Sequence, residues 1–276
     1  MIIWLASYPK SGNTLVRSLV SAYFFSKDGI YDFNQINNIQ QFPMVKFFED
    51  FGIDIKDEKE VIKNYIKVQA KLNKKKSLQF FKTHSALFNI NNNAFTDLEN
   101  SLGVIYIVRD PRNVVTSWAY HNSLSIQDSC DYMIFQKEGA GNINKIYHGT
   151  WNYNFNSWKS FKYQDRYLLI KYEDLILNKK KIFLKILNFI QKFQKKKNQI
   201  DMLKVDNILK TTTFESMKNL EIKKGFKESI KDSDTGKDKP FFNLGPNNKW
   251  QNLLEDKIRY KIENAFKNEM KELGYI

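Results

Sequence analysis

The chain begins with the stretch Met1-Ile2-Ile3-Trp4-Leu5-Ala6-Ser7-Tyr8-Pro9-Lys10-Ser11-Gly12-Asn13-Thr14. The apolar residues from Ile2 to Ala6 predict a short buried strand, and the Pro/Ser/Gly turn after them leads into an amphipathic helical pattern from Leu15 to Phe25. A strand, a turn and a helix in this order are typical of a phosphate-binding loop, in which the first N–H groups of the helix face an anion.

The loop differs from one that binds nucleoside triphosphates, which follows the pattern G-x-x-x-x-G-K-[ST]. Gly12 and Thr14 match that pattern, but Asn13 stands in the lysine position and Ser7 in the position of the first glycine. The local lysine, Lys10, comes three residues early. This favours a ligand whose 5′-phosphate lies at the helix start and whose transferred group projects toward Lys10.

The rest of the chain alternates between strand and helix patterns. Strands are predicted at 77–82, 103–108 and 166–171, and helices at 58–76, 111–121, 150–161, 179–193 and 253–273. Residues 28–57 and 122–149 have no clear period, and 229–248 have the composition of a loop. We expect a three-layer α/β sandwich with a central, mainly parallel sheet and a phosphate-binding loop, in one domain over residues 1–276.

Two further groups of polar residues follow predicted strands, at the edge where open α/β sheets bind ligands. Arg109 and Ser117 suit a phosphate dianion, whereas Arg112 is expected to be an exposed residue at a helix start. Lys82 and His84 alternate along a strand and therefore point the same way. Near neutral pH a histidine can accept a proton, and a lysine can stabilise charge on a leaving oxygen.

The formal net charge is +14, and only five of the 44 basic residues are arginines. The lysine runs at 74–76, 179–181 and 195–197 lack interleaved aromatics or arginines, which is more typical of solvated helix faces than of a nucleic-acid site. We therefore expect no nucleic-acid partner.

Cysteine and histidine usage limits the other classes. The single cysteine, Cys130, excludes an intrachain disulfide and a thiolate metal cluster. The histidines His84, His121 and His148 are far apart in the sequence and suggest no metal site. With no apolar run as long as a membrane span and no leader pattern, we expect a cytoplasmic protein without a metal or a transmembrane segment.

These motifs together resemble the cytosolic-type sulfotransferases, which use 3′-phosphoadenosine 5′-phosphosulfate (PAPS) as co-substrate. Residues 8–14 look like the family's 5′-phosphosulfate loop, YPKSGTTW, and residues 104–117 look like its 3′-phosphate segment. Residues 81–84 resemble its Lys-Thr-His motif and residues 171–175 its Tyr-Glu-Asp-Leu strand end. The resemblance implies a fold like that of the P-loop NTPases and extends from residue 3 to about 221.

The resemblance also implies roles for individual residues. The 5′-phosphosulfate would be held by Lys10, Ser11, Gly12, Asn13 and Thr14, the 3′-phosphate by Arg109 and Ser117, and the adenine by Tyr172, Thr212 and Phe214. His84 would be the base of an in-line sulfuryl transfer, with Lys10 and Lys82 stabilising the leaving phosphate oxygen. The acceptor would be a hydroxyl or amine of a small molecule, carbohydrate or lipid.

The sequence departs from the family pattern in several places. Asn13 replaces the first of two usual threonines, Leu15 replaces a tryptophan, and Asn243-Leu244 stand where an Arg-Lys pair is usual. The missing charge could come from Lys237, Lys239 or Lys249. Acceptor contacts are expected from residues 28–57, 122–149 and 225–248. Aromatic residues in these regions either line an apolar acceptor site or pack as an irregular cover over the fold: Phe33, Phe42, Phe47, Phe48, Tyr132, Phe135 and Tyr147.

Three alternatives stay open at this point. A divergent P-loop small-molecule kinase would bind ATP with Mg²⁺, although the missing loop lysine disfavours it. A basic nucleic-acid-binding protein would bind with a steep salt dependence. A relative that binds PAPS but has lost activity is disfavoured by the presence of Lys82 and His84.

Overall fold

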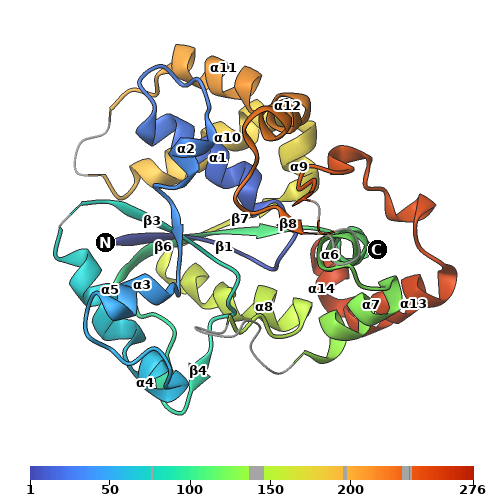
Figure 1. Cartoon of the computed structure of the whole chain (residues 1–276), viewed down its shortest axis with the longest axis horizontal. Coiled ribbons are helices and arrows are strands. Elements are labelled where there is room, and N and C mark those ends of the chain that lie inside the picture. Colours follow the sequence, from blue (N-terminus) through green and yellow to red (C-terminus); the bar gives the residue numbers. More distant parts are fainter. Residues whose placement is uncertain (76, 137–145, 195–197, 232–235, 237) are drawn as a thin grey trace.

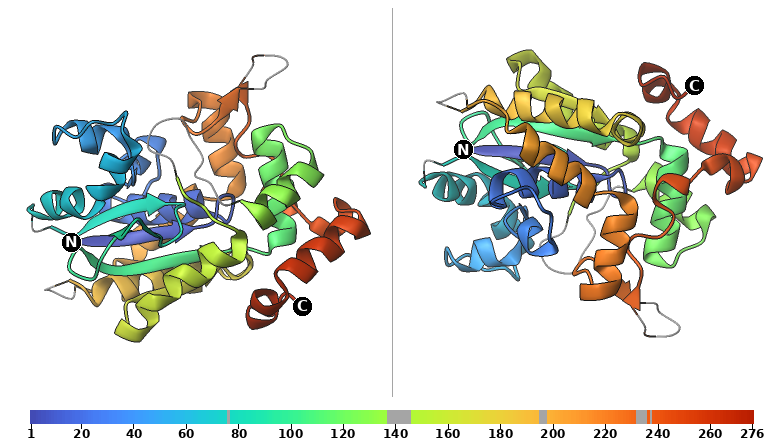
Figure 2. Two further views of the ribbon diagram at one scale, coloured as in Figure 1. Left: turned by 90° about the horizontal axis from the view of Figure 1, so that it is seen from below. Right: turned by 90° about the horizontal axis from the view of Figure 1, so that it is seen from above.

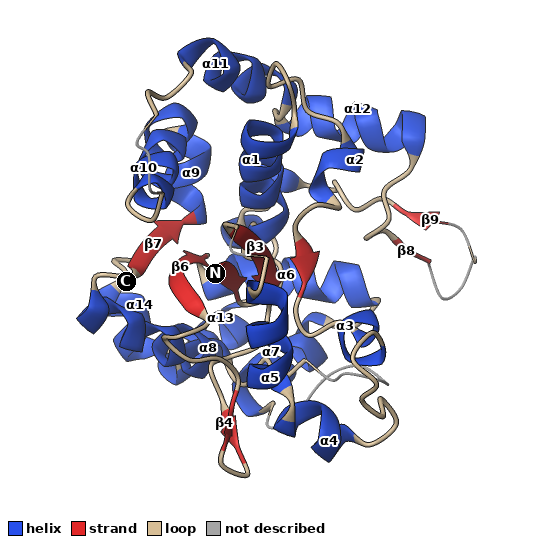
Figure 3. Cartoon of the chain, turned by 90° about the vertical axis from the view of Figure 1, so that its left-hand side faces the viewer, coloured by secondary structure: helices blue, strands red, loops and turns tan. Residues whose placement is uncertain are grey.

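The centre of the protein is a parallel sheet, seen in a computed structural model that describes residues 1–75, 77–136, 146–194, 198–231, 236 and 238–276. Within these residues the sheet has five strands in the order β2-β3-β1-β6-β7, and every neighbouring pair is parallel (Figure 3). The strands are β1 (Ile2–Ser7), β2 (Gln40–Gln41), β3 (Gln79–Thr83), β6 (Ser101–Val108) and β7 (Tyr167–Lys171). The sequence prediction of a three-layer sandwich is confirmed.

The three layers follow from alternating burial along each strand. In β1, Ile2 and Trp4 face one apolar core, whereas Ile3 and Leu5 face the other. Because both faces are covered, the central strands are nearly continuous apolar runs, as parallel sheets require.

Helices cover both faces of the sheet (Figure 1). One layer contains α1 (Asn13–Phe25), α2 (Phe33–Ile36), α9 (Tyr172–Leu177), α10 (Lys179–Gln191), α11 (Met202–Thr211) and α12 (Phe214–Lys224). The other contains α3 (Val45–Glu49), α4 (Glu58–Lys63), α5 (Tyr65–Asn73), α8 (Trp151–Ser157) and the 3-10 helix η1 (Trp158–Gln164). At one end of the sheet, α6 (Pro111–Asn122) and α7 (Ile126–Phe135) lie beside α13 (Asp256–Ala265) and α14 (Lys267–Glu272), as both views of Figure 2 show.

The start of α6 matches its sequence prediction. The Asp110 carboxylate accepts a hydrogen bond from the Arg112 N–H, and Pro111 occupies the first turn, where the missing N–H costs nothing. This cap fixes the point at which β6 becomes α6.

Several predicted boundaries were wrong in detail. The helix predicted at 58–76 is interrupted at Asn64, whose side chain donates to the Glu60 carbonyl. The final helix breaks at Phe266, which leaves helical geometry while its ring packs on Trp151. The segment predicted at 150–161 is α8 followed by η1. At Asn64 and Phe266 the helix is broken where a side chain makes a hydrogen bond or a packing contact, which the periodicity of the sequence does not reveal.

The regions predicted as irregular contain short elements. Residues 28–57 form α2, β2 and α3, and 122–149 contain α7. Small additional pieces are the strands β4 (Asn89–Ile90), β5 (Asn93–Ala94), β8 (Ile230–Lys231) and β9 (Asp238–Lys239), and the 3-10 helices η2 (Gly245–Asn247) and η3 (Trp250–Asn252). Over the part of the chain that is described, no helix combines the length and apolar character needed to cross a bilayer.

Candidate active site

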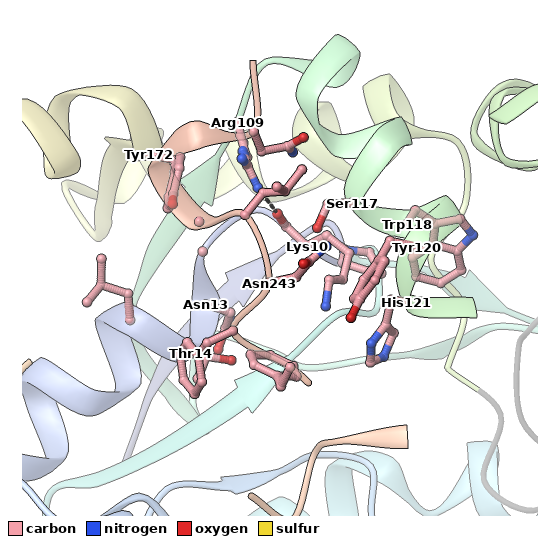
Figure 4. A pocket seen from close by; sticks show the side chains of 18 of the residues that line it. Lys10, Asn13, Thr14, Arg109, Ser117, Trp118, Tyr120, His121, Tyr172 and Asn243 are labelled. Atoms are coloured by element: carbon pink, nitrogen blue, oxygen red, sulfur yellow. Dashed lines mark hydrogen bonds between the residues drawn. The ribbon is translucent and has the colours of Figure 1, made fainter. Parts of the chain in front are cut away.

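A cavity of about 490 Å³ opens at the carboxyl ends of the central strands. Its walls include the loop from β1 to α1, the end of β3, the second half of α6 and the segment from Phe241 that leads into η2 (Figure 4). Within the described residues, it gathers nearly all the predicted site residues: Lys10, Gly12, Asn13, Thr14, Lys82, His84, Arg109, Ser117, Tyr172, Thr212 and Phe214. Ser11 is fully buried in the same loop.

The loop backbone is shaped to bring the helix start toward the cavity. Gly12 caps α1 with a φ of 99°, and no side chain caps this helix. A Cβ atom at Gly12 would lie 2.4 Å from Cδ2 of Tyr172, so glycine is needed both for the backbone angle and for the close approach of the ring. Lys10 also has a positive φ, 63°, a strain that a non-glycine residue carries when the turn must aim its side chain.

Four buried polar side-chain atoms in or beside this loop have no hydrogen-bond partner in the described part of the chain: Oη of Tyr8, Oγ of Ser11, Oδ1 of Asn13 and Nε of Arg109. Oγ of Ser11 and Nε of Arg109 are the donors among them that belong to residues predicted to bind the ligand. Buried polar groups are normally paired, and an unpaired one points to a missing partner. Together with the uncapped helix start, they fit an anionic group of the size of a phosphate.

Asn13 lies in the cavity wall, but its side-chain amide is turned toward the sheet. Nδ2 donates to the Leu5 carbonyl at 2.9 Å and to Oγ of Ser7 at 3.2 Å. The amide therefore ties the start of α1 to β1. Among the groups of Asn13, its backbone N–H, at the helix start, is the one suited to a phosphate.

Lys10 and Arg109 are linked through the loop backbone. Nη1 of Arg109 donates to the Lys10 carbonyl at 3.1 Å, and its guanidinium lies 4.3 Å from the Tyr172 ring centroid. Nζ of Lys10 lies 4.3 Å from the ring centroid of Phe241. The pKa of Lys10 is lowered to about 7, mainly by burial and also by the charges of Lys82 and Arg109, against the opposing effect of Glu228. The site is thus rich in poorly solvated positive charge.

His84 is fixed by the end of β1. Its Nδ1 lies 3.0 Å from the Ser7 carbonyl oxygen and 3.2 Å from Ser7 Oγ. Since a carbonyl can only accept, Nδ1 carries the hydrogen and Nε2 keeps its lone pair. Burial lowers the pKa of His84 well below its ordinary value, and nearby Lys82 adds to this effect. The neutral imidazole is the form that a general base requires.

The end of the cavity near Arg109 and Tyr172 is suited to a nucleobase and a second phosphate group. Ser117 lies on α6 facing the cavity below Arg109, and Tyr172 begins α9 across from it (Figure 4). Thr212 and Phe214 complete this wall, although Oγ1 of Thr212 is already bonded to the Ile208 carbonyl at 2.6 Å. Asn243 and Leu244, at the place of the expected basic pair, line the cavity without charge.

Two of the suggested substitutes for that pair, Lys239 and Lys249, are not in the cavity wall. Nζ of Lys239 donates to Oγ of Ser123 at 3.1 Å, and Lys249 is exposed. Lys237 lies outside the described residues. The cavity is lined instead by Lys179, whose Nζ donates to the Thr212 carbonyl and whose pKa burial lowers to about 8. Lysine run 179–181 is therefore not wholly a solvated face, while runs 74–76 and 195–197 include undescribed residues.

The prediction that Arg112 is exposed was wrong. Only 6% of the residue is exposed, because its guanidinium pairs with Asp110 at 2.7 Å and Glu263 at 2.6 Å. It also lies 4.1 Å from the ring centroid of Trp250. Arg112 therefore ties α6 to α13 and to η3.

Of the seven aromatics that were expected either to line a site or to pack a cover, four are buried in the cores of the sheet, whereas Phe135 is 63% exposed. Phe42, Phe47 and Phe48 belong to the core below the sheet, and Phe33 to the core above it. The rings that do line the cavity are Trp118, Tyr120, Phe214, Phe241 and Phe242, together with Tyr172.

Sequence reasoning missed several cavity residues. Tyr120 and His121 lie three and four positions after Ser117 on the same helix, so helical periodicity could have found them. His148 also lines the cavity, which brings all three histidines of the chain to one site. Glu228, which pairs with Lys82 from 146 positions away, gives no local signal.

The fold and the cavity define an α/β protein of the phosphate-loop type that binds an extended anionic ligand beside a neutral histidine. A family model described as the sulfotransferase domain matches residues 2–274. The chain therefore belongs to the sulfotransferase domain family and is an enzyme of the sulfotransferase class, with the fold of the P-loop NTPases.

Curated relatives are distant but cover most of the chain. Flavonol 3-sulfotransferase of Flaveria bidentis is 22% identical over 99% of this chain and 83% of its own length. Human sulfotransferase 1E1 is 25% identical over 97% of this chain and 83% of its own length. Luciferin sulfotransferase of Photinus pyralis is 27% identical over 79% of this chain and 56% of its own length.

Solved structures share the fold. Mouse sulfotransferase SULT7A1, complexed with PAP, superimposes with a TM-score of 0.61 at 19% identity, covering 98% of this chain and 84% of that one. Retinol dehydratase in a complex with retinol and PAP gives a TM-score of 0.61 at 15% identity, covering 98% and 81%.

Proposed function

We propose that this enzyme moves the sulfuryl group of PAPS to a hydroxyl or amine of a small-molecule acceptor. The observation that supports this most is the convergence of Lys10, Lys82, His84 and Arg109 on one cavity that begins at an uncapped helix N-terminus. PAPS has a 5′-phosphosulfate and a 3′-phosphate, and the cavity has cationic groups at both corresponding ends.

The residues have distinct tasks in this proposal. The loop from Lys10 to Thr14 holds the 5′-phosphosulfate, Arg109 and Ser117 hold the 3′-phosphate, and the adenine lies between Tyr172 and Phe214. Of Asn13, the backbone N–H makes this contact, because its amide is bound to β1. Ser11 contributes the buried hydroxyl that has no partner within the described chain.

The transfer step follows from the geometry of His84 and the two lysines. The acceptor oxygen forms a bond to sulfur while the bond from sulfur to the bridging phosphate oxygen breaks. The acceptor proton passes to Nε2 of His84, which the hydrogen bond from Nδ1 to Ser7 keeps free. The leaving phosphate oxygen gains negative charge, which Lys10 and Lys82 stabilise in a poorly solvated site.

The acceptor end of the cavity favours an apolar, ring-bearing alcohol over a carbohydrate. Trp118, Tyr120 and Phe241 line it together with His121, and His121 and Phe241 lie in edge contact, with ring centroids 5.9 Å apart. Aromatic walls supply a large apolar contact area for a flat ligand. The curated relatives named for a flavonol and for luciferin are consistent with this class.

The proposal also covers the domain organisation and the compartment of the protein. We infer that residues 1–276 act as one sulfotransferase domain, because the cavity draws its walls from the first loop and from residues 241–248. We also keep the cytoplasm as the compartment, since Cys130 is a free, buried thiol.

Transfer of labelled sulfate from PAPS to a panel of phenols, aliphatic alcohols, amines and sugars, without added Mg²⁺, tests the function. We expect transfer to phenols first, abolished in His84→Ala while calorimetric binding of PAP persists. The absence of PAPS and PAP binding to the wild-type enzyme would overturn the proposal. Equal transfer to sugars would overturn the acceptor class alone.

A further inference from the structure

Glu228 places a carboxylate among the cations of the active site. It lies between α12 and β8, and its side chain enters the cavity. Oε1 accepts hydrogen bonds from Nη1 of Arg17 at 2.5 Å and from Nζ of Lys82 at 3.0 Å. Oε2 accepts one from Oγ1 of Thr14 at 3.4 Å. Two of these three partners, Lys82 and Thr14, are groups that we assign to the donor.

The third partner holds the carboxylate in place. Arg17 is 5% exposed and also donates, through Nη2, to the carbonyls of Ile36 at 3.3 Å and Ile39 at 3.0 Å. It does not line the cavity and so cannot itself be shared with a ligand there. Glu228 is thus held on one side by Arg17 and on the other by Lys82 and Thr14.

Glu228 is ionised in this setting. Burial alone would raise its pKa, but the nearby charges of Lys82 and Arg17 outweigh burial and lower the pKa below the usual range. A second anion cannot approach Lys82 at contact distance without repulsion from this carboxylate, and poor solvation strengthens that repulsion. A donor and Glu228 therefore compete for the same cation.

We propose that Glu228 is a specificity-determining residue of the donor site: an internal anion that occupies Lys82 and Thr14 until a ligand anchored elsewhere in the cavity displaces it. The proposal rests on the proposed function. A nucleotide also held at Arg109, Ser117 and Tyr172 has enough contacts to displace the carboxylate. A lone tetrahedral anion, such as inorganic sulfate or phosphate, has only the loop and Lys82, and is kept out.

Because Glu228 and a ligand compete for Lys82, only a fraction of the protein molecules can bind an anion at any time. The apparent affinity of any anion falls by the fraction of molecules in which Glu228 has released Lys82. Removing the carboxylate charge raises that fraction for every anion. The gain is the same factor for every anion that needs Lys82, so inorganic sulfate, which has no other anchor, rises from undetectable to measurable binding while PAP binds more tightly by that factor.

Glu228→Gln tests the proposal, because it removes the charge and keeps the shape. Its matched control is Glu272→Gln, which removes one negative charge from a surface pair with Lys159. Calorimetric titrations use PAP, inorganic sulfate and neutral adenosine on both variants and on the wild-type enzyme. We expect Glu228→Gln to bind PAP about tenfold more tightly, within the range typical of couplings between sites, and to bind sulfate detectably, with adenosine unchanged and the control like wild type.

Each other outcome has a definite meaning. Unchanged or weaker binding of both anions to Glu228→Gln would overturn the proposal and make Glu228 a support for Lys82. If neither the wild type nor any variant binds PAP, the proposed function fails, whereas a gain in sulfate binding would still establish Glu228 as an internal anion.

A second variant guards against loss of folding. Removing the charge leaves Arg17 and Lys82 without their counter-ion, and an unpaired buried charge is strongly destabilising. Glu228→Asp keeps the charge but is one methylene shorter, so it cannot contact Arg17 and Lys82 as Glu228 does. We expect it to show the same direction at smaller size, and sulfate to raise its melting temperature more than that of the wild type. An equal or smaller rise would overturn the proposal.

Discussion

Nδ1 of His84 and the carbonyl oxygen of Ser7 are 3.0 Å apart, so β1 determines which nitrogen of the histidine faces the cavity. Because the carbonyl accepts the Nδ1 hydrogen, Nε2 is left as the proton acceptor. The end of the strand that begins the phosphate loop therefore also orients the proposed base, which couples donor binding and proton removal in one stretch of backbone.

The pH dependence of turnover tests this arrangement on its acid side. Burial lowers the pKa of His84 well below its ordinary value of 6.5. The base is active when neutral, so activity is kept as pH falls through 6.5 and is lost only near the lowered pKa. A profile of kcat/KM against pH should place the acid limb below 6.5. A limb at or above 6.5 would contradict the assignment of this histidine.

The lowered pKa of Lys10 leads to a prediction for the alkaline limb of the profile of kcat/KM against pH. Its pKa in the free enzyme is lowered to about 7, mainly by burial. Above that pH the side chain is neutral and stabilises the anionic donor less, so kcat/KM for PAPS should fall as pH rises through about 7. In Lys10→Arg the charge persists, and this limb should move up by more than one unit. A limb that stays in place would assign the titration to another group.

Local sequence was sufficient for the parts of the site that lie on contiguous motifs. The loop from Tyr8 to Thr14, the Lys82–His84 pair and the Arg109–Ser117 segment each follow a buried strand, and parallel strands bring their carboxyl ends together. The helix cap at Asp110 could be predicted for the same reason, since its signal lies within three residues.

Tertiary pairing determined what the sequence did not reveal. Arg112 was expected to be exposed because a helix start usually is, but Glu263, 151 positions later, covers it. Asn13 stands where a threonine is usual, and the sequence does not reveal that the Leu5 carbonyl accepts a hydrogen bond from its amide. Glu228 comes from a segment with no periodic or motif signal. Each depends on a partner distant in sequence or on the direction of one side chain.

Asn154 predicts an effect on turnover without an effect on donor binding. It is fully buried on α8, and Nδ2 donates to the carbonyls of His84 at 2.9 Å and His148 at 2.7 Å. The hydroxyl of Tyr106 donates to its Oδ1 at 2.7 Å. Asn154→Ala leaves these groups unpaired, so we expect kcat to fall at least about tenfold and stability to fall by about 1–3 kcal/mol.

The matched control for Asn154→Ala lies on the same helix. Asn156→Ala removes an exposed bond to Glu269 and should leave kcat unchanged. A positioning role requires that Asn154→Ala lower kcat while PAP binds with wild-type affinity and KM for the acceptor stays near its wild-type value. Weakened PAP binding alongside the loss of kcat would show a general structural role instead.

We predict different effects for substitutions of Arg109 and Arg112, although the two residues are three positions apart. Arg109→Gln should weaken PAP binding at least about tenfold and leave adenosine 5′-monophosphate nearly unaffected, because the charge-assisted bond that we propose for Arg109 is to the 3′-phosphate. Arg112→Gln breaks the pairs with Asp110 and Glu263, so it should lower the melting temperature without changing the ratio of the two affinities. Calorimetry of both nucleotides and thermal denaturation separate the two. An equal loss of both nucleotides in Arg109→Gln would place Arg109 elsewhere on the donor.

From the geometry at Gly12 we predict that the backbone of the loop, and not only its side chains, determines the affinity for the donor. In Gly12→Ala the new Cβ atom would lie 2.4 Å from Cδ2 of Tyr172, at a φ of 99°. Gly52→Ala is the control, because Gly52 also has a positive φ, 68°, with nothing within 4 Å of the added atom. Both variants carry backbone strain of about 1–2 kcal/mol, and both should melt at lower temperature. Only Gly12→Ala must displace the Tyr172 ring and disturb the helix start, so it alone should weaken PAP binding, by about tenfold or more. Wild-type affinity in Gly12→Ala would mean that the ring moves without consequence and that Tyr172 does not contact the adenine.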